Sequence, residues 1–193
     1  WVVGAHAADY AVIVCQSAYI KAHYPVEYAA ALLSVDRDDT ERIALLAADC
    51  RALGIKLLRP DIDRSDVDFA IEELDHADLA DPAVSHRRGI RFGLAGIKNV
   101  GQASVEAILR GRGDRPFESL EDLCRRVDMR AVGKRALESL VRVGALDRYG
   151  PRGSLLAAVD RLMSASSTHF QAAEVGQLSL FGDGPSGSGE AGR

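Results

Sequence analysis

The spacing of apolar residues predicts a helical chain with one short interruption by strands. Apolar side chains recur every three and four residues over 6–23 and again after Pro25, a residue that suits the first turn of a helix. A third helix is predicted over 38–53, because acidic residues precede its apolar stripe and Gly54 follows as a C-terminal cap. The same spacing predicts later helices at about 101–110, 119–127, 133–142 and 153–164.

Between these helical parts the apolar pattern changes to a repeat of two residues. Residues 67–72 and 90–94 alternate apolar and polar side chains, and 55–58 form a short apolar run, so these segments predict strands of a small sheet. Residues 182–193 are rich in Gly and Ser, which predicts a disordered tail. The predicted fold class is therefore mainly α with a small β element (α+β).

The net charge of −4 over 193 residues conceals an uneven distribution. Residues 1–85 carry a balance of −9, residues 86–152 a balance of +7, and residues 153–193 a balance of −2. A basic middle part indicates a polyanionic partner, which the whole-chain charge argues against.

Cysteine and histidine spacing excludes the common metal-site patterns. The three cysteines are scattered and the five histidines show no ligand spacing, so we predict no metal site and reduced thiols. No run approaches the ~18 apolar residues of a membrane span, and no signal peptide is evident. We therefore predict a cytoplasmic protein without membrane contact. The chain begins at Trp1 rather than Met and is expected to be a slice of a longer one.

The segment 94–109 is the most informative part of the sequence. It predicts a short apolar helix, a tight turn and a second, amphipathic helix, held together by Ile97, Val100, Ala107 and Ile108. Backbone amides at the start of the second helix can bind a phosphate, and nearby cations add attraction that is independent of base sequence. The candidate DNA-binding residues are Lys98, Asn99, Val100, Gly101, Gln102, Ala103 and Arg110.

This segment resembles the helix-hairpin-helix motif of polymerases, ligases and repair nucleases, which grips duplex DNA by its phosphates. The turn of that motif usually reads Gly-hydrophobic-Gly, and Asn99 stands here at the first glycine. Asn tolerates the left-handed backbone conformation better than most residues, so we expect the turn to survive. The alternative is an ordinary helical turn with surface charge.

A second, looser copy is predicted downstream. Residues 117–123 would supply its first helix, and a helix that closes at Gly144 would supply its second. Its candidate DNA-binding residues are Gly133, Lys134 and Arg135.

Residues 177–181 form a short, mainly apolar peptide near the end of the chain. Leu180 and Phe181 in a flexible region would be costly to expose without a partner. The peptide resembles the pentapeptide by which bacterial replication and repair proteins bind the sliding clamp, so the candidate clamp-binding residues are Gln177, Leu178, Ser179, Leu180 and Phe181. The alternative is local packing onto the helix at 153–164.

Taken in order, these motifs resemble the alpha subunit of bacterial DNA polymerase III, the C-family of replicative polymerases. The similarity lies in residues 6–11, 16–28, 31–33, 60–63, 90–94, 97–101, 117–122, 135–140 and 177–181. It implies the end of the polymerase fingers at 1–54, a strand-containing connection at 55–94, a helix-hairpin-helix module at 95–152, a helix at 153–172, and the clamp peptide with its linker at 173–193.

The resemblance implies template-directed DNA synthesis by the parent polymerase, with two Mg²⁺ ions held by palm aspartates upstream of Trp1. We therefore expect no catalytic residue and no cofactor in this chain, and no polymerase activity from it alone. Asp61 and Asp63 are interpreted as turn formers rather than metal ligands.

The implied partners are duplex DNA, the sliding clamp (the beta subunit) and other subunits of the polymerase III holoenzyme. The alternative function is a non-enzymatic adaptor in repair that joins DNA to the clamp. A nuclease ranks last, because no carboxylate or histidine constellation supports one.

Overall fold

The computed structural model describes residues 2–181, with side chains over 7–174. Its elements follow one another as α1 (Val2–His23), α2 (Pro25–Val35), α3 (Thr40–Ala52), β1 (Leu57–Leu58), β2 (Ala70–Glu73), α4 (His76–Leu79), β3 (Arg88–Arg91), the 3₁₀ turn η1 (Leu94–Gly96), α5 (Gln102–Arg112), α6 (Leu120–Arg126), α7 (Met129–Val132), α8 (Lys134–Val143), the 3₁₀ turn η2 (Asp147–Tyr149) and α9 (Arg152–Phe181).

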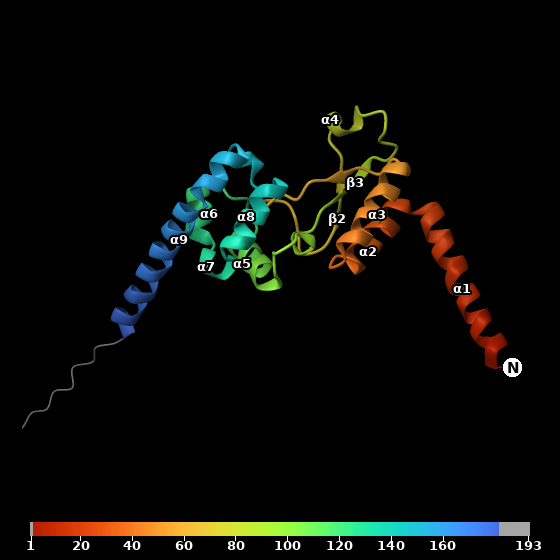
Figure 1. Ribbon diagram of the computed structural model, residues 1–193, viewed down its shortest axis with the longest axis horizontal. Helices are drawn as coiled ribbons and strands as arrows, with labels where there is room; N and C mark the ends of the chain where they lie inside the picture. The colour runs from red at the N-terminus through yellow and green to blue at the C-terminus, as the bar shows by residue number, and fades with distance from the viewer. Residues whose placement is uncertain (1, 182–193) are drawn as a thin grey trace, which may run out of the picture.

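The first three helices lie where the sequence predicts, although α1 begins four residues before the predicted start at residue 6 and α3 begins two residues after the predicted start at residue 38. Pro25 is the first residue of α2. Asp39 caps α3 by accepting hydrogen bonds from the amides of Glu41 and Arg42, and Gly54 follows with a positive φ of 69°. Helix α1 projects from α2 at one end of the molecule (Figure 1) and leaves most of its side chains exposed, including Val14 at 64%.

The predicted sheet is confirmed and has the order β1-β3-β2. Strand β3 lies in the centre, parallel to β1 through the pair Leu57 and Ile90, and antiparallel to β2. Ile90 is fully buried, and β3 also carries Arg91, which bonds to Glu72 across the β2 pairing. The sheet lies between α2 and α3 on one side and the unit of α5 to α9 on the other (Figure 1).

Two hydrophobic cores follow from this arrangement. One joins α2 and α3 to the sheet through residues such as Leu33 and Phe69, and the other fills the helical unit around Phe117 and Leu140. Phe92 packs against both cores and contacts Phe69 with tilted rings, whose centroids are 4.5 Å apart. The connection after the sheet is therefore packed onto the helical unit.

The mainly α fold class with a small sheet is confirmed, and two expectations about helices are corrected. The structure adds α4 and α7, two helices of four residues each that are too short to show apolar periodicity. Helix α9 extends to Phe181, beyond the end at 172 that we predicted, because residues 171–181 contain several good helix formers and no proline. The predicted disordered tail at 182–193 lies outside the described residues.

Candidate nucleic-acid interface

The turn of the first hairpin has the geometry that the sequence predicts, whereas the predicted short apolar helix before it is the three-residue 3₁₀ turn η1. Among the residues described, Asn99 is the one non-glycine residue with a positive φ, at 68°, so it takes the left-handed place of the missing glycine. Ile97 and Val100 are buried beneath the turn, while Lys98 and Asn99 are exposed. Gly101 then starts α5.

The second hairpin differs from the prediction. Its first helix is α7 rather than the helix predicted from residues 117–123, which lie at the start of α6 and just before it. Val127 is extended and ends α6, and Asp128 then caps a new helix by accepting the amide of Arg130. Gly133, with φ of 81°, connects α7 directly to α8.

The two hairpins repeat the same sequence pattern thirty-two residues apart. Residues 97–101 and 129–133 both read apolar, basic, any residue, valine, glycine. The apolar residues of the pattern are buried in both copies, at Ile97 and Val100 and again at Met129 and Val132. This repeat in the sequence could have predicted the second hairpin at α7. It also identifies Arg130, which the sequence analysis missed, as the counterpart of Lys98.

Two hydrogen bonds join the hairpins reciprocally. The Ser104 hydroxyl in the first turn of α5 donates to the backbone carbonyl of Val132 at 2.8 Å. In return, the Asn99 side-chain amide in the first turn region donates to the Ser139 hydroxyl of α8 at 3.3 Å. The start of α5 therefore lies beside the turn that begins α8, and the two hairpins form one unit.

Helices α5 and α8 begin differently from α3, α4, α6 and α7; α2 also has no side-chain cap, but it carries Glu27 in its first turn. A side chain caps each of α3, α4, α6 and α7, through Asp39, Asp75, Ser119 and Asp128. By contrast, α5 and α8 start at Gly101 and Gly133, with no side-chain cap and no acidic residue in the first turn. Their first-turn amides therefore remain available to an external acceptor such as a phosphate.

Both glycines also leave room for that acceptor. A Cβ atom at Gly101 or at Gly133 would meet no heavy atom within 4 Å. The glycines are therefore not required by packing inside the protein. Gly133 is required by its positive φ, whereas Gly101 has an ordinary φ of −81°.

The cations near the hairpins fall into two groups. Lys98, Arg110 and Arg135 are exposed and make no ion pair within the part of the chain that the structure describes. Lys134, in contrast, lies 2.6 Å from Asp160 of α9, whose hydrogen bond raises the pKa of the ammonium. Arg130 bonds to Asp128, and their pairing lowers the pKa of that carboxyl.

Not all predicted DNA-binding residues lie together. Residues 98–103 and 133–135 form the neighbouring turns and helix starts described above. Arg110 lies in the last turn of α5, about 12 Å along the helix from Gln102. It can meet only a phosphate further along a duplex.

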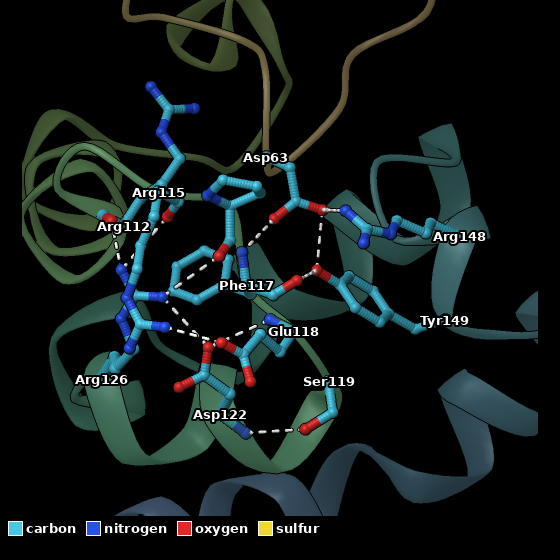
Figure 2. A network of polar contacts seen from close by, with 11 residues as sticks. Asp63, Arg112, Arg115, Phe117, Glu118, Ser119, Asp122, Arg126, Arg148 and Tyr149 are labelled. Atoms are coloured by element: carbon cyan, nitrogen blue, oxygen red, sulfur yellow. Dashed lines mark hydrogen bonds and ion pairs between the residues drawn. The ribbon is translucent and has the colours of Figure 1, made fainter.

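A network of buried polar groups supports the hairpin unit (Figure 2). The Asp63 carboxylate, 3% exposed, accepts hydrogen bonds from the Phe117 amide and from the Tyr149 hydroxyl, both at 2.7 Å. Burial and the bond to Asp63 raise the pKa of Tyr149 well above its ordinary value, so its hydroxyl stays protonated. Asp61 in turn accepts the Asp63 amide, which confirms the predicted turn-forming role of Asp61, whereas the carboxylate of Asp63 bonds to distant segments instead of its own turn.

Arg126 occupies the other side of the same network. Its guanidinium lies over the Phe117 ring, bonds to Asp122 at 3.0 Å and donates to the backbone carbonyl of Arg112 near the end of α5. A cation at that position satisfies carbonyls that the end of a helix leaves without partners. The network thus fixes α5 against the loop that leads to α6.

Three further sequence predictions concern metal ions, the membrane and the clamp peptide. Within residues 7–174, no group of three or more His, Cys, Asp or Glu residues is arranged to hold a metal ion. None of the helices within the described residues is both long and apolar enough to cross a membrane. The backbone of the clamp-peptide residues 177–181 forms the end of α9, and their side chains lie outside the described ones.

Comparison with known families agrees with this geometry. The family described as "Helix-hairpin-helix motif" matches residues 54–155, which is more than half of the chain and includes both hairpins. The chain therefore belongs to this helix-hairpin-helix family.

The curated proteins that are similar to this chain include alpha subunits of DNA polymerase III. DNA polymerase III subunit alpha of Thermus aquaticus is 44% identical over 182 residues, which cover 92% of this chain and 14% of that relative. The subunits of Vibrio cholerae and Escherichia coli K12 are 37% and 35% identical over 179 residues each, again with 92% and 14% coverage. The resemblance to the polymerase III alpha family is thereby confirmed, and the chain spans about a seventh of the length of these relatives.

Proposed function

We propose that this chain binds duplex DNA through its phosphates, without reading bases, as part of a replicative polymerase alpha subunit. The observation that carries the proposal is the pair of uncapped helix starts at Gly101 and Gly133, which hydrogen bonds hold side by side. Backbone amides recognise phosphates independently of sequence, and Lys98 and Arg135 add charge next to them.

Replacing Gly101 by alanine tests the close approach of a phosphate. We expect duplex affinity to fall about fivefold, because a methyl group on this surface lengthens charge-assisted hydrogen bonds to the first-turn amides. The unfolding midpoint should not fall, since the space around Gly101 is open and its φ suits alanine. Fluorescence anisotropy with a labelled duplex, titrated at several salt concentrations, measures the affinity.

Gly153→Ala is the matched control. Gly153 also has no heavy atom within 4 Å of a built Cβ, but it lies in the first turn of α9. Equal affinities for Gly101→Ala and Gly153→Ala would contradict a phosphate at α5, and absence of duplex binding at low salt would refute the proposed function.

We also propose that the parent protein carries out template-directed DNA synthesis in the cytoplasm, together with other holoenzyme subunits. The alpha-subunit relatives at 32–44% identity support this proposal over a free adaptor. The Mg²⁺ ions of the reaction are expected outside this chain. The chain alone is therefore expected to be inactive in primer extension.

The peptide 177–181 is proposed to tether the polymerase to the sliding clamp. A tether raises the effective concentration of the polymerase at the primer end without tighter DNA binding. We expect replacement of Leu180 and Phe181 by alanine to lower clamp affinity at least about tenfold, because such anchors carry most of the energy of a short motif. Duplex affinity should not change.

Surface plasmon resonance with immobilised clamp measures this effect. Leu45→Ala provides the control, because Leu45 is a leucine on α3 that is 67% exposed and far along the chain from the peptide. Clamp affinity that is the same for the wild type and for the double variant would reject the tether.

A further inference from the structure

Helix α9 directs both of its carboxylates at the second hairpin. Asp160 and Glu174 are the only acidic residues in the sequence of α9. Asp160 lies 2.6 Å from the ammonium of Lys134, the first residue of α8, and Glu174 lies 2.7 Å from the guanidinium of Arg130 in α7. The two acidic residues of this helix thus pair with the two cations that flank Gly133.

The spacing along α9 accounts for this arrangement. The two carboxylates are fourteen residues apart, which is about four helical turns and places them on one face. Ser166 lies between them on the docked side, fully buried, where its hydroxyl accepts the Met129 amide and donates to the Val127 carbonyl. A buried hydroxyl therefore anchors α9 on the second hairpin, and an ion pair lies on either side of this anchor.

The first hairpin has no such cover within the described residues. Lys98, the counterpart of Arg130 in the repeat, makes no ion pair there. The counterpart of Lys134 is Gln102, which donates a hydrogen bond to Glu106 of its own helix. The two hairpins share a backbone design but differ in the charge that they can offer to DNA.

We propose that α9 acts as an intramolecular substitute for phosphate, so that DNA engages the first hairpin freely and the second only by displacing Asp160 and Glu174. The inference rests on the proposed DNA-binding function. All four side chains of the two pairs are between 37% and 77% exposed, so solvent screens the pairs and a phosphate can replace them. The acidic face of α9 therefore competes with DNA at one hairpin without closing the other.

Neutralising the two carboxylates tests this competition. For Asp160→Asn combined with Glu174→Gln, we expect duplex affinity at 0.1 M salt to rise about fivefold, the size of effect that exposed pairs of this kind allow. The slope of log affinity against log salt should steepen by about one, because Lys134 becomes available to a phosphate whereas Arg130 keeps its pairing with Asp128. Anisotropy titrations of the full chain from low to moderate salt give both quantities.

Glu41→Gln combined with Asp49→Asn is the control for net charge. Both carboxylates are exposed on α3, in the other part of the molecule, so this pair should leave the slope unchanged. Circular dichroism reports whether α9 remains helical in each variant. Addition of Arg130→Ala and Lys134→Ala to the neutralised chain should abolish the gain.

The outcomes separate this inference from the proposed function. The role of α9 alone is overturned if two results occur together. In that case the Asp160→Asn, Glu174→Gln chain has the same salt slope as the wild type, while Lys98→Ala still weakens duplex binding by the wild type. The role of α9 is also overturned if Lys134→Ala lowers the duplex affinity of the wild type as much as Lys98→Ala does. If Lys98→Ala leaves duplex affinity unchanged in both the wild type and the neutralised chain, the proposed function itself is refuted.

Discussion

Replacing Asp63 by alanine is expected to lower the free energy of unfolding by about 3 kcal/mol while leaving duplex affinity below the melting temperature unchanged. The carboxylate is almost fully buried and accepts hydrogen bonds from the Phe117 amide and the Tyr149 hydroxyl. Its removal leaves the amide of the buried Phe117 without this acceptor, which costs about 1–3 kcal/mol. The Tyr149 hydroxyl would keep only the Phe117 carbonyl, at 3.0 Å.

Urea unfolding followed by circular dichroism measures this change, which should appear in the midpoint rather than in the slope. Asp66→Ala is the control, because Asp66 is an exposed loop residue whose carboxylate accepts a hydrogen bond from the adjacent Val67 amide; we expect a change within about 0.5 kcal/mol. Tyr149→Phe removes one bond of the network and should cost about 1 kcal/mol. If Asp63→Ala costs no more than Asp66→Ala, the network does not hold the unit together.

The importance of Asp63 comes from its place between the two cores. The segment around Ile62 leads from the sheet to the helical unit, and the Ile62 amide donates to the carbonyl of Ala145 at 3.0 Å. Ile62 itself is buried in the core of the helical unit. A weaker bond network here loosens this connection before it disturbs the helix starts at Gly101 and Gly133.

The first hairpin could be predicted from the sequence because everything that specifies it is local. A buried residue at 97, an exposed Asn99 with left-handed backbone and a helix that starts at Gly101 lie within five consecutive residues. Turn chemistry and apolar spacing act over such distances, and both are visible in the sequence. The same holds for α3 with its Asp39 cap.

The features that the sequence did not predict depend on contacts between distant segments. The bond from the Phe117 amide to Asp63 spans 54 residues, and the pair of Arg130 with Glu174 spans 44. No local pattern indicates which carboxylate such a cation meets. The sequence therefore predicted that Lys134 is available to DNA, whereas the structure pairs it with Asp160.

Removal of the unpaired cations beside the helix starts should have the largest effect on DNA binding. For Lys98→Ala combined with Arg135→Ala, we expect duplex affinity at 0.1 M salt to fall on the order of fiftyfold. Each lost phosphate contact lowers the salt slope by about 0.9, so the slope should decrease by about two. Both residues are exposed and make no ion pair within the described residues, so stability should not suffer.

Arg161→Ala is the matched control for this double variant. Arg161 is also an exposed arginine without an ion pair in the described part, but it lines a groove between α6 and α9. Its loss should change affinity by less than about twofold, as expected for a charge that contacts no phosphate. Duplexes of unrelated sequence should lose affinity for the double variant to the same extent, because backbone contacts carry no base information. If the loss depends on base sequence, or if Arg161→Ala matches the double variant, the helix starts are not the phosphate-binding surface.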